Sequence, residues 1–302
     1  MGPVAGPFCA NVARALRNDK LESALMIDAH QHFWQLGRND CTWPTPDLAR
    51  IHRDFGPDDL APFAERAGIS ATVLVQSQAS DRDTDFLLDL AAKTPLVGAV
   101  VGWVDFKSVS APARIAELAR HPKMRGLRPM LQNLADDAWI LDSALTPALD
   151  AMRAHRLSFD ALVRPHHLQH LRTFAARHPD LPIVIDHGAK PRIADGILDP
   201  WRADMRALAL LPNVFCKLSG LVTEAQPGWQ PHDLAPYVAH LVDCFGPERL
   251  MWGSDWPVLA LAGEYEGWLR VAKLLTGLAE AKDLDAVFRG TASRFYRTKA
   301  SW

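Results

Sequence analysis

The sequence predicts a single (β/α)8 barrel of the α/β class. Eight short runs rich in apolar and β-branched residues alternate along the chain with longer amphipathic runs. That alternation is typical of parallel strands joined by crossover helices. The 302 residues, 48% of them hydrophobic, are enough for one such barrel. No Ser- or Gly-rich linker marks a second domain. The alternative fold is an open doubly wound sheet, but no predicted strand is followed by its GxGxxG loop.

The predicted strands and helices follow one another from residue 25 to residue 256. Strands are expected at 25–32, 71–78, 96–105, 124–131, 157–163, 182–188, 213–220 and 249–256. Helices are expected between them at 84–93, 112–121, 145–156, 167–178, 200–211 and 233–245. In the run 213–220 an apolar face alternates with a polar face that carries Lys217 and Ser219. We therefore expect Lys217 and Ser219 to point into the barrel.

Residues 1–24 are predicted to be an extension that precedes the barrel domain of residues 25–302. The segment has basic residues but lacks the apolar core and cleavage pattern of a secretory signal. We interpret it as a disordered extension or as the product of a misplaced start codon, because Met26 would itself make a sensible start. The missing targeting signals favour a cytoplasmic location.

Composition limits the partners of this chain. The formal net charge is -2 and the basic residues are scattered, which argues against a nucleic-acid partner. No apolar run approaches the roughly 20 residues that span a bilayer, which argues against a membrane protein. The four cysteines form no CxxC pair, so a zinc ribbon is not expected. A small-molecule partner remains, and a homo-oligomer is compatible with the sequence.

Polar residues gather at the predicted carboxyl ends of the strands, where the chemistry of a (β/α)8 barrel is located. These residues are His30, His32, Gln76, Gln78, Arg128, Asp186, His187, Lys217, Ser219 and Asp255. The two histidines of "IDAHQHFW" are one residue apart, so a regular strand would point both to one face, with Asp28 below them. By the same rule Asp186 would point away from its neighbour His187.

Three motifs in this order resemble those of the amidohydrolase superfamily: HxH in the first strand, "DHGAKP" after the sixth and "WGSDWP" after the eighth. The likeness is greatest to its lactonase branch, which contains L-fuconolactonase, L-rhamnonolactonase and 2-pyrone-4,6-dicarboxylate lactonase. It runs from Met26 to Arg297 and includes "VGWVDF", "RGLRPMLQ" and "CKLSGL". The resemblance implies a distorted barrel of the amidohydrolase type.

The resemblance also implies a ligand set, which is His30, His32, His187 and Asp255. Metal-rich relatives carry a carbamylated lysine on the fourth strand, and Arg128 occupies that region here. We therefore expect one divalent ion or none, in place of two metal ions, and zinc is the first candidate. Activity without metal is compatible with this ligand set.

The residue types support the same roles on chemical grounds. Three imidazoles and a carboxylate suit a mononuclear zinc ion, which would acidify a water molecule and polarise a lactone carbonyl. Without metal, the histidines can donate hydrogen bonds to a developing oxyanion, and Asp255 can take a proton from water. The catalytic candidates are accordingly Asp255, His187 and Arg128. Taken singly, His187 could belong to a buried hydrogen-bond network and Asp255 could cap the following segment.

Further side chains are candidates for substrate binding. The guanidinium of Arg128 could bind a carbonyl or a pair of hydroxyls, or it could be a structural ion-pair partner. His167 follows the fifth strand, and tryptophans near the motifs could form a wall against a sugar ring. The full set is Arg128, His167, Trp34, Gln76, Trp103 and Lys217.

We interpret the sequence as that of a carboxylic ester hydrolase that opens a small lactone, first of all a sugar-acid lactone. Three alternatives stay open: a pyrone-dicarboxylate lactonase, a nonoxidative aromatic-acid decarboxylase of the same superfamily, and a sugar-binding module without catalysis.

Overall fold

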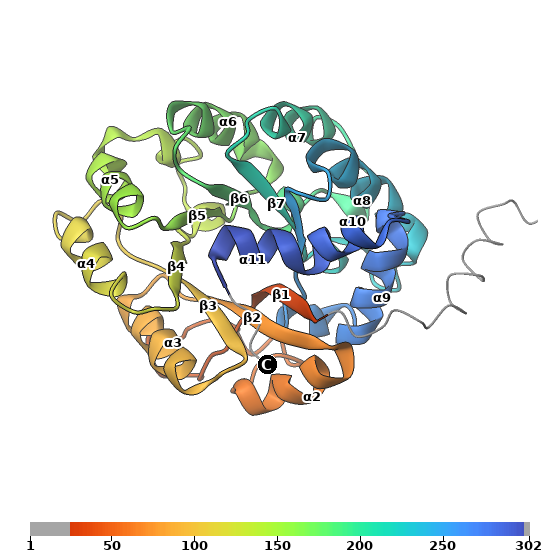
Figure 1. Cartoon of the computed structure of the whole chain (residues 1–302), viewed down its shortest axis with the longest axis horizontal. Coiled ribbons are helices and arrows are strands. Elements are labelled where there is room, and N and C mark those ends of the chain that lie inside the picture. The colour runs from red at the N-terminus through yellow and green to blue at the C-terminus, as the bar shows by residue number, and fades with distance from the viewer. Residues whose placement is uncertain (1–24, 299–302) are drawn as a thin grey trace, which may run out of the picture.

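A computed structural model describes residues 25–298, and it contains the predicted barrel (Figure 1). The predicted extension 1–24 lies outside the described residues. One sheet holds eight parallel strands in chain order. They are β1 (Met26–Gln31), β2 (Ile69–Val75), β3 (Val97–Gly102), β4 (Met124–Leu127), β5 (Ser158–Ala161), β6 (Ile183–Ile185), β7 (Val214–Leu218) and β8 (Leu250–Trp252).

All eight predicted strands are found, but several end earlier than predicted. The prediction of 182–188 corresponds to β6, which ends at Ile185, and that of 249–256 to β8, which ends at Trp252. The polar residues that follow leave the sheet and form turns, so their side chains are not bound to strict strand alternation.

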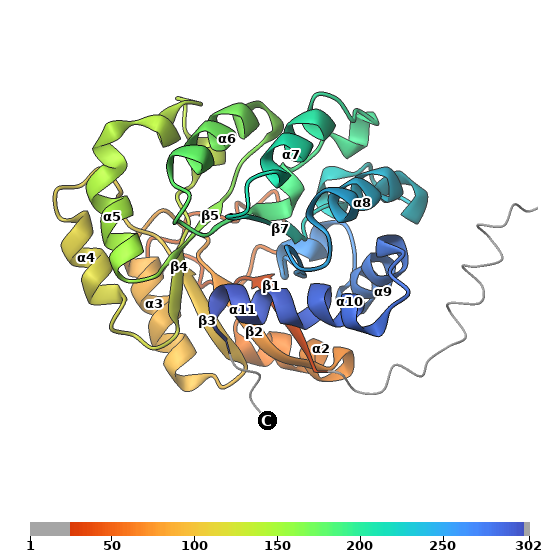
Figure 2. The ribbon, with the colours of Figure 1, turned by 45° about the horizontal axis from the view of Figure 1, so that its top comes forward.

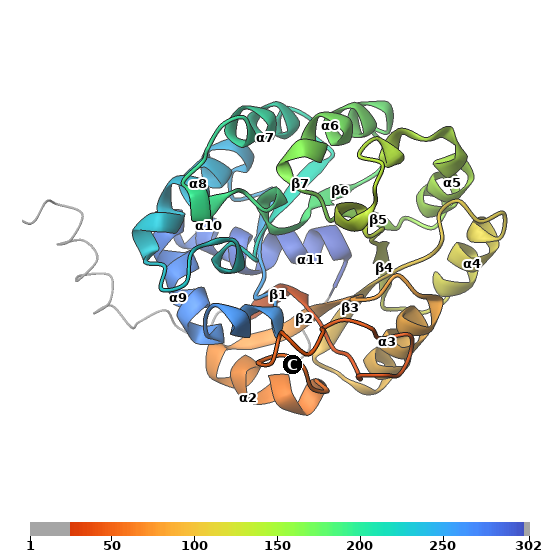
Figure 3. The same cartoon turned by 180° about the vertical axis from the view of Figure 1, so that it is seen from behind.

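Helices surround the sheet on its outer side, and the last helix lies across one end of the barrel (Figures 2 and 3). They are α2 (Pro57–Ala67), α3 (Asp81–Lys93), α4 (Ala111–Leu118), α5 (Thr146–Ala154), α6 (Leu168–Arg177), α7 (Trp201–Ala209), α8 (Pro231–Phe245), α9 (Tyr265–Thr276), α10 (Ala281–Asp285) and α11 (Thr291–Tyr296). The six predicted helices correspond to α3 through α8, and no prediction was made for α2 or for α9 to α11. Local signals set the ends: Ser80 Oγ accepts the backbone N–H of Arg82 at 3.0 Å at the start of α3. Within residues 25–298, no helix has the length and apolar character to cross a membrane.

The barrel interior is apolar at the end where the strands begin, and α11 covers that end (Figure 1). The buried cluster there comprises Ile27, Ala29, Ala71, Val73, Val75, Ala99, Val101, Val184, Met251, Ala292 and Tyr296. A larger cluster fills the layer between the sheet and the helices. A catalytic site is therefore expected at the opposite end of the barrel, where the strands end.

The expectation for Asp28 is wrong. The pairing of β1 with β2 shifts register between Asp28 and Gln31, which breaks the alternation of faces. Asp28 does not lie under the histidines: its Oδ2 accepts the hydroxyl of Tyr265 in α9 at 2.8 Å. It is Ala29 that belongs to the interior cluster.

Candidate active site

The barrel closes where the segment after β8 meets the end of β1, and this closure brings Asp255 beside two histidines. The backbone N–H of Asp255 donates to the carbonyl of His30 at 2.8 Å, and the N–H of His32 donates to the carbonyl of Trp256 at 2.8 Å. Asp255 Oδ1 then lies 3.4 Å from His32 Nε2 and 3.8 Å from His30 Nε2. Residues more than 220 positions apart in sequence are thus neighbours because the barrel is closed.

The turn after β6 adds His187 to this group and corrects the expectation for Asp186. Residues 186–189 form a tight turn in which His187 has a φ of 55°. That left-handed backbone ends the alternation of the strand, so Asp186 and His187 both face the interior. His187 Nε2 lies 3.9 Å from Asp255 Oδ1, and Asp186 Oδ1 lies 3.5 Å from His30 Nδ1.

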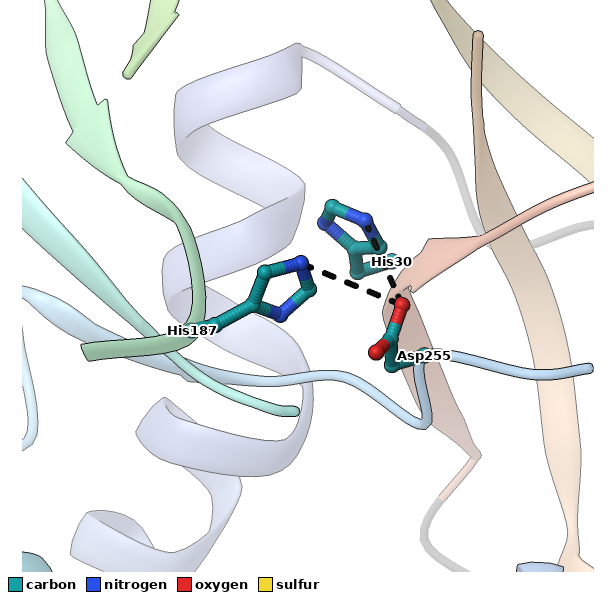
Figure 4. A group of neighbouring side chains, drawn as sticks. All are labelled: His30, His187 and Asp255. Carbon is teal, nitrogen blue, oxygen red and sulfur yellow. Dashed lines mark ion pairs between the residues drawn. The ribbon is translucent and has the colours of Figure 1, made fainter. Parts of the chain in front are cut away.

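His187 is held from its other ring nitrogen by the end of β7. Its Nδ1 lies 2.9 Å from the hydroxyl oxygen of Ser219, within hydrogen-bond distance. The strand 213–220 therefore does supply an inward polar face, as predicted. Figure 4 shows His30, His187 and Asp255 pointing toward one another from three separate segments.

Burial keeps the imidazoles neutral and a carboxylate is ionised among them. Desolvation lowers the pKa of His187 to about 4, and it lowers the pKa of His30 and of His32 below the ordinary histidine value. Desolvation alone would raise the pKa of Asp255, but the facing imidazoles outweigh it and hold this pKa below its usual range. At neutral pH the site thus presents one negative charge and neutral nitrogen atoms.

The donor set fits a divalent ion in atom type and in spacing. One ligand atom each from His30, His187 and Asp255 lies within 4.8 Å of the others. The separations of 3.4–3.9 Å between Asp255 Oδ1 and the imidazole nitrogens exceed direct hydrogen bonds. Ligands bound tetrahedrally to one zinc ion at about 2.0–2.2 Å would lie roughly 3.3 Å apart. The residues present could therefore hold zinc.

A second layer of charged groups lies inside the barrel behind His30. Lys217 is 0% exposed, and its Nζ lies 2.7 Å from Asp160 Oδ2 and 2.9 Å from Asp186 Oδ1. Its position inside the barrel agrees with the predicted face. The structure does not bring Lys217 to the open mouth, because its ammonium is enclosed by these carboxylates.

Arg128 belongs to the same layer. Its Nη1 donates to Asp186 Oδ2 at 3.2 Å, and its Nη2 donates to the backbone carbonyl of Gln76. The amide Nε2 of Gln76 donates in turn to the Arg128 carbonyl at 2.7 Å, which leaves the buried Gln76 Oε1 without a partner among the described residues. The interpretation of Arg128 as a structural ion-pair partner accounts for these contacts. The Arg128 guanidinium also lies 3.4 Å from His30 Nε2.

The tryptophans predicted to line the mouth have different surroundings. Trp34 is 0% exposed, and its indole N–H donates to the carbonyl of Arg53 at 2.8 Å. It packs against Trp43 and Phe55, so it serves the core and offers no open face to a substrate. Trp103 is half-buried and remains a candidate for substrate contact.

His167 stands in a separate group from the central histidines. Its Nδ1 accepts the backbone N–H of Arg164 at 3.0 Å, and its Nε2 lies 3.4 Å from the exposed Asp137. With His166 these residues form a second cluster of potential ligand atoms. The structure thus buries His167 beside Asp137 and does not join it to Asp255.

Two buried residues of the second layer were missed by sequence reasoning. Asp160 sits in the apolar run "LSFDALV", where a charged residue in an interior strand was a signal that could have been used. Tyr296, in α11, donates its hydroxyl to Asp160 Oδ2 at 2.5 Å. Nothing in the local sequence indicates that contact.

Comparison with known proteins agrees with this arrangement. The family model described as "Amidohydrolase" matches residues 27–298. A Burkholderia ambifaria protein named L-fucono-1,5-lactonase is 55% identical over 275 residues, covering 90% of this chain and 95% of the relative. A Burkholderia multivorans protein with the same name is 39% identical and covers 90% of this chain and 96% of its own.

A solved structure has the same architecture. It is an amidohydrolase from Burkholderia multivorans with bound zinc, which is 38% identical, covers 91% of this chain and 100% of its own, and has a TM-score of 0.86. The family model spans nearly all of the described residues, and these relatives exceed 30% identity over most of their length. This chain belongs to the amidohydrolase family.

Proposed function

We propose that this protein hydrolyses a sugar-acid lactone, with L-fucono-1,5-lactone as the first substrate to test, and releases the hydroxy acid. The observation that carries the proposal is the Asp255 carboxylate surrounded by neutral imidazoles at the end of the barrel where the strands finish. The relatives of highest identity reported above, which bear the name L-fucono-1,5-lactonase, support the substrate class.

The proposed chemistry is an addition of water followed by ring opening. Asp255 takes a proton from water while the water oxygen bonds to the lactone carbonyl carbon. The carbon–oxygen bond of the ring then breaks, and Asp255 returns the proton to the departing ring oxygen. Imidazole N–H groups of the site stabilise the negative charge on the carbonyl oxygen.

Zinc is the divalent ion that we propose for His30, His32, His187 and Asp255. When bound, it would acidify a water molecule and polarise the carbonyl. Because neutral imidazoles can stabilise an oxyanion without metal, we propose that catalysis does not strictly require it.

Charge disfavours a pyrone dicarboxylate as substrate. Two cations near the site, Arg128 and Lys217, are already paired with buried carboxylates. Lys190 lies 3.3 Å from Glu224, so it too is paired. These three pairs leave a dianion little uncompensated positive charge at the ends of β4, β6 and β7, whereas a neutral sugar lactone needs none.

The test is acid release measured with a pH indicator on L-fucono-1,5-lactone, other aldonolactones and a pyrone dicarboxylate, each corrected for spontaneous opening. It is run on the enzyme as purified and after chelation. Hydrolysis of aldonolactones supports the proposal, and its persistence after chelation assigns the imidazoles to hydrogen bonding. Inactivity on every lactone, or carbon dioxide release from an aromatic acid, overturns it. Ligand binding that Asp255→Asn leaves intact, with no turnover by either protein, would identify a binding module.

A further inference from the structure

We propose that Lys190 and Glu224 form a hydroxyl-binding pair beside His187, which selects polyhydroxylated lactones over lactones without hydroxyls. Neither residue belongs to the proposed ligand set or to the charged layer behind His30. The effect of the pair on hydrolysis rests on the proposed function, whereas its recognition of a neutral sugar ring requires no catalysis.

The turn after β6 places Lys190 on the same side as His187. Residues 187–190 have φ values of 55°, 55°, 62° and 51°, and the Lys190 N–H donates to the His187 carbonyl at 2.9 Å. This bond closes one left-handed turn, and side chains three residues apart in such a turn lie above one another. Desolvation is the main cause of the lowered pKa of His187, and the Lys190 ammonium acts in the same direction, which agrees with this placement.

The backbone of this turn is strained. His187, Ala189 and Lys190 all have positive φ although none is glycine, and L-residues adopt this conformation rarely and as single residues. Such strain persists where the surrounding structure fixes it, and it clusters at functional sites. Here the buried Trp201 fixes the turn, because its indole N–H donates to the carbonyl of Gly188 at 2.7 Å. A function of Lys190 accounts for strain that continues three residues beyond His187.

Glu224 reaches the same place from the segment after β7. This segment passes His187 at Ser219 and Gly220 and then forms the short turn Val222–Glu224. Glu224 Oε1 lies 3.3 Å from Lys190 Nζ, and the two side chains are 21% and 18% exposed. Within residues 25–298, every other ion pair of Lys or Arg with Asp or Glu is enclosed in the barrel or has an exposed partner. This pair is partly buried on both sides and still accessible to a ligand.

Both charged groups retain hydrogen-bonding capacity. Their separation of 3.3 Å is longer than a charge-assisted hydrogen bond of about 2.7–2.9 Å, and within the described part of the chain neither group has another polar partner. An ammonium only donates and a carboxylate only accepts. Two adjacent hydroxyls of a sugar ring match them, because one hydroxyl accepts from Lys190 and the other donates to Glu224. The pair has no net charge, which suits a neutral polyol.

The first test compares kcat/KM for L-fucono-1,5-lactone with kcat/KM for δ-valerolactone, a six-membered lactone without hydroxyls. In Lys190→Met and in Glu224→Gln the ratio of these values should fall about 10–100-fold, which is the effect of losing a hydrogen bond to a charged group. Arg192→Met is the matched control, because it removes a cation of the same segment whose pair with Asp195 is exposed, and it should keep the ratio. An unchanged ratio in the folded Lys190 and Glu224 variants, including an equal loss on both lactones, overturns the proposal.

The second test is independent of turnover. L-fucose has the corresponding ring hydroxyls but no lactone carbonyl, and saturation-transfer NMR should detect its binding to the unmodified enzyme. Lys190→Met and Glu224→Gln should each raise its Kd about tenfold or more, and Arg192→Met should not. Absence of L-fucose binding, or equal Kd values in all four proteins, refutes the hydroxyl-binding pair. If L-fucose binding depends on the pair but no lactone is hydrolysed, the proposed function fails and the recognition of hydroxyls stands.

Discussion

Gly220 and His187 lie so close that a Cβ atom on residue 220 would be 2.5 Å from His187 Nδ1. Gly220 also has a φ of +62°, which L-residues rarely adopt. The segment after β7 thus packs its bare backbone against the imidazole while Ser219 contacts the same nitrogen. The position of His187 relative to Asp255 depends on this contact.

Gly220→Ala should displace His187 and lower kcat/KM for the lactone about 100-fold, since a misplacement near 1 Å has effects of this size. Gly196→Ala is the matched control, because Gly196 has a φ of +65° but open space where a Cβ would be. Both variants should lose thermal stability from backbone strain, Gly220→Ala more because its methyl group also meets His187, and only Gly220→Ala should lose activity. Equal activities in steady-state assays would show that His187 is not fixed by this contact.

Asp255→Asn should retain the fold and reduce kcat about 10²–10⁴-fold, because the amide cannot accept the proton from water. Asp195→Asn serves as control, since Asp195 lies in an exposed pair with Arg192 at 2.8 Å. Circular dichroism and urea unfolding should show both variants folded. Turnover close to that of the unmodified enzyme would exclude Asp255 as the base.

Asp28→Asn should remove a pH dependence of stability. Desolvation raises the pKa of buried Asp28 to about 6 in the folded protein, whereas the pKa of an aspartate in the unfolded chain is 3.8. Between these values the folded state binds more protons than the unfolded state, so this group's contribution to stability is present below pH 4 and is lost as the pH rises through 6. The loss is about 3 kcal/mol at neutral pH.

The amide suits the site. Asp28 Oδ1 accepts two backbone N–H groups, from Ser254 at 2.8 Å and His30 at 3.1 Å, while Oδ2 faces the Tyr265 hydroxyl. An asparagine can accept both N–H groups and donate to the tyrosine oxygen. Urea unfolding at pH 4.5 and 7.5 should show the variant gaining stability over the unmodified protein as the pH rises. A constant difference would contradict the raised pKa.

Arg128→Met should separate the two interpretations of Arg128. Loss of one partner of a buried ion pair is expected to reduce the free energy of unfolding by about 3–5 kcal/mol. Arg192→Met, which breaks the exposed pair with Asp195, should cost about 1 kcal/mol or less. A stable Arg128→Met enzyme with a greatly raised KM would instead favour direct substrate binding.

The sequence by itself determined the eight strands, six of the helices and the grouping of His30, His32, His187 and Asp255 at one end of the barrel. These follow from local patterning and from the rule that parallel strands finish on the same side. Local patterns of apolar and polar residues, combined with that rule, can be recognised in the sequence without coordinates.

Only the tertiary structure decided how the interior charges are paired and which way several side chains face. The register shift after Asp28 and the left-handed turn at His187 override strand alternation. The contacts of Lys217 with Asp160, and of Tyr296 in the last helix with the same carboxylate, join segments brought together by barrel closure. The physical reason for these contacts is the free-energy cost of burying a charge. Only partner groups that the folded chain brings close to the charge lower that cost.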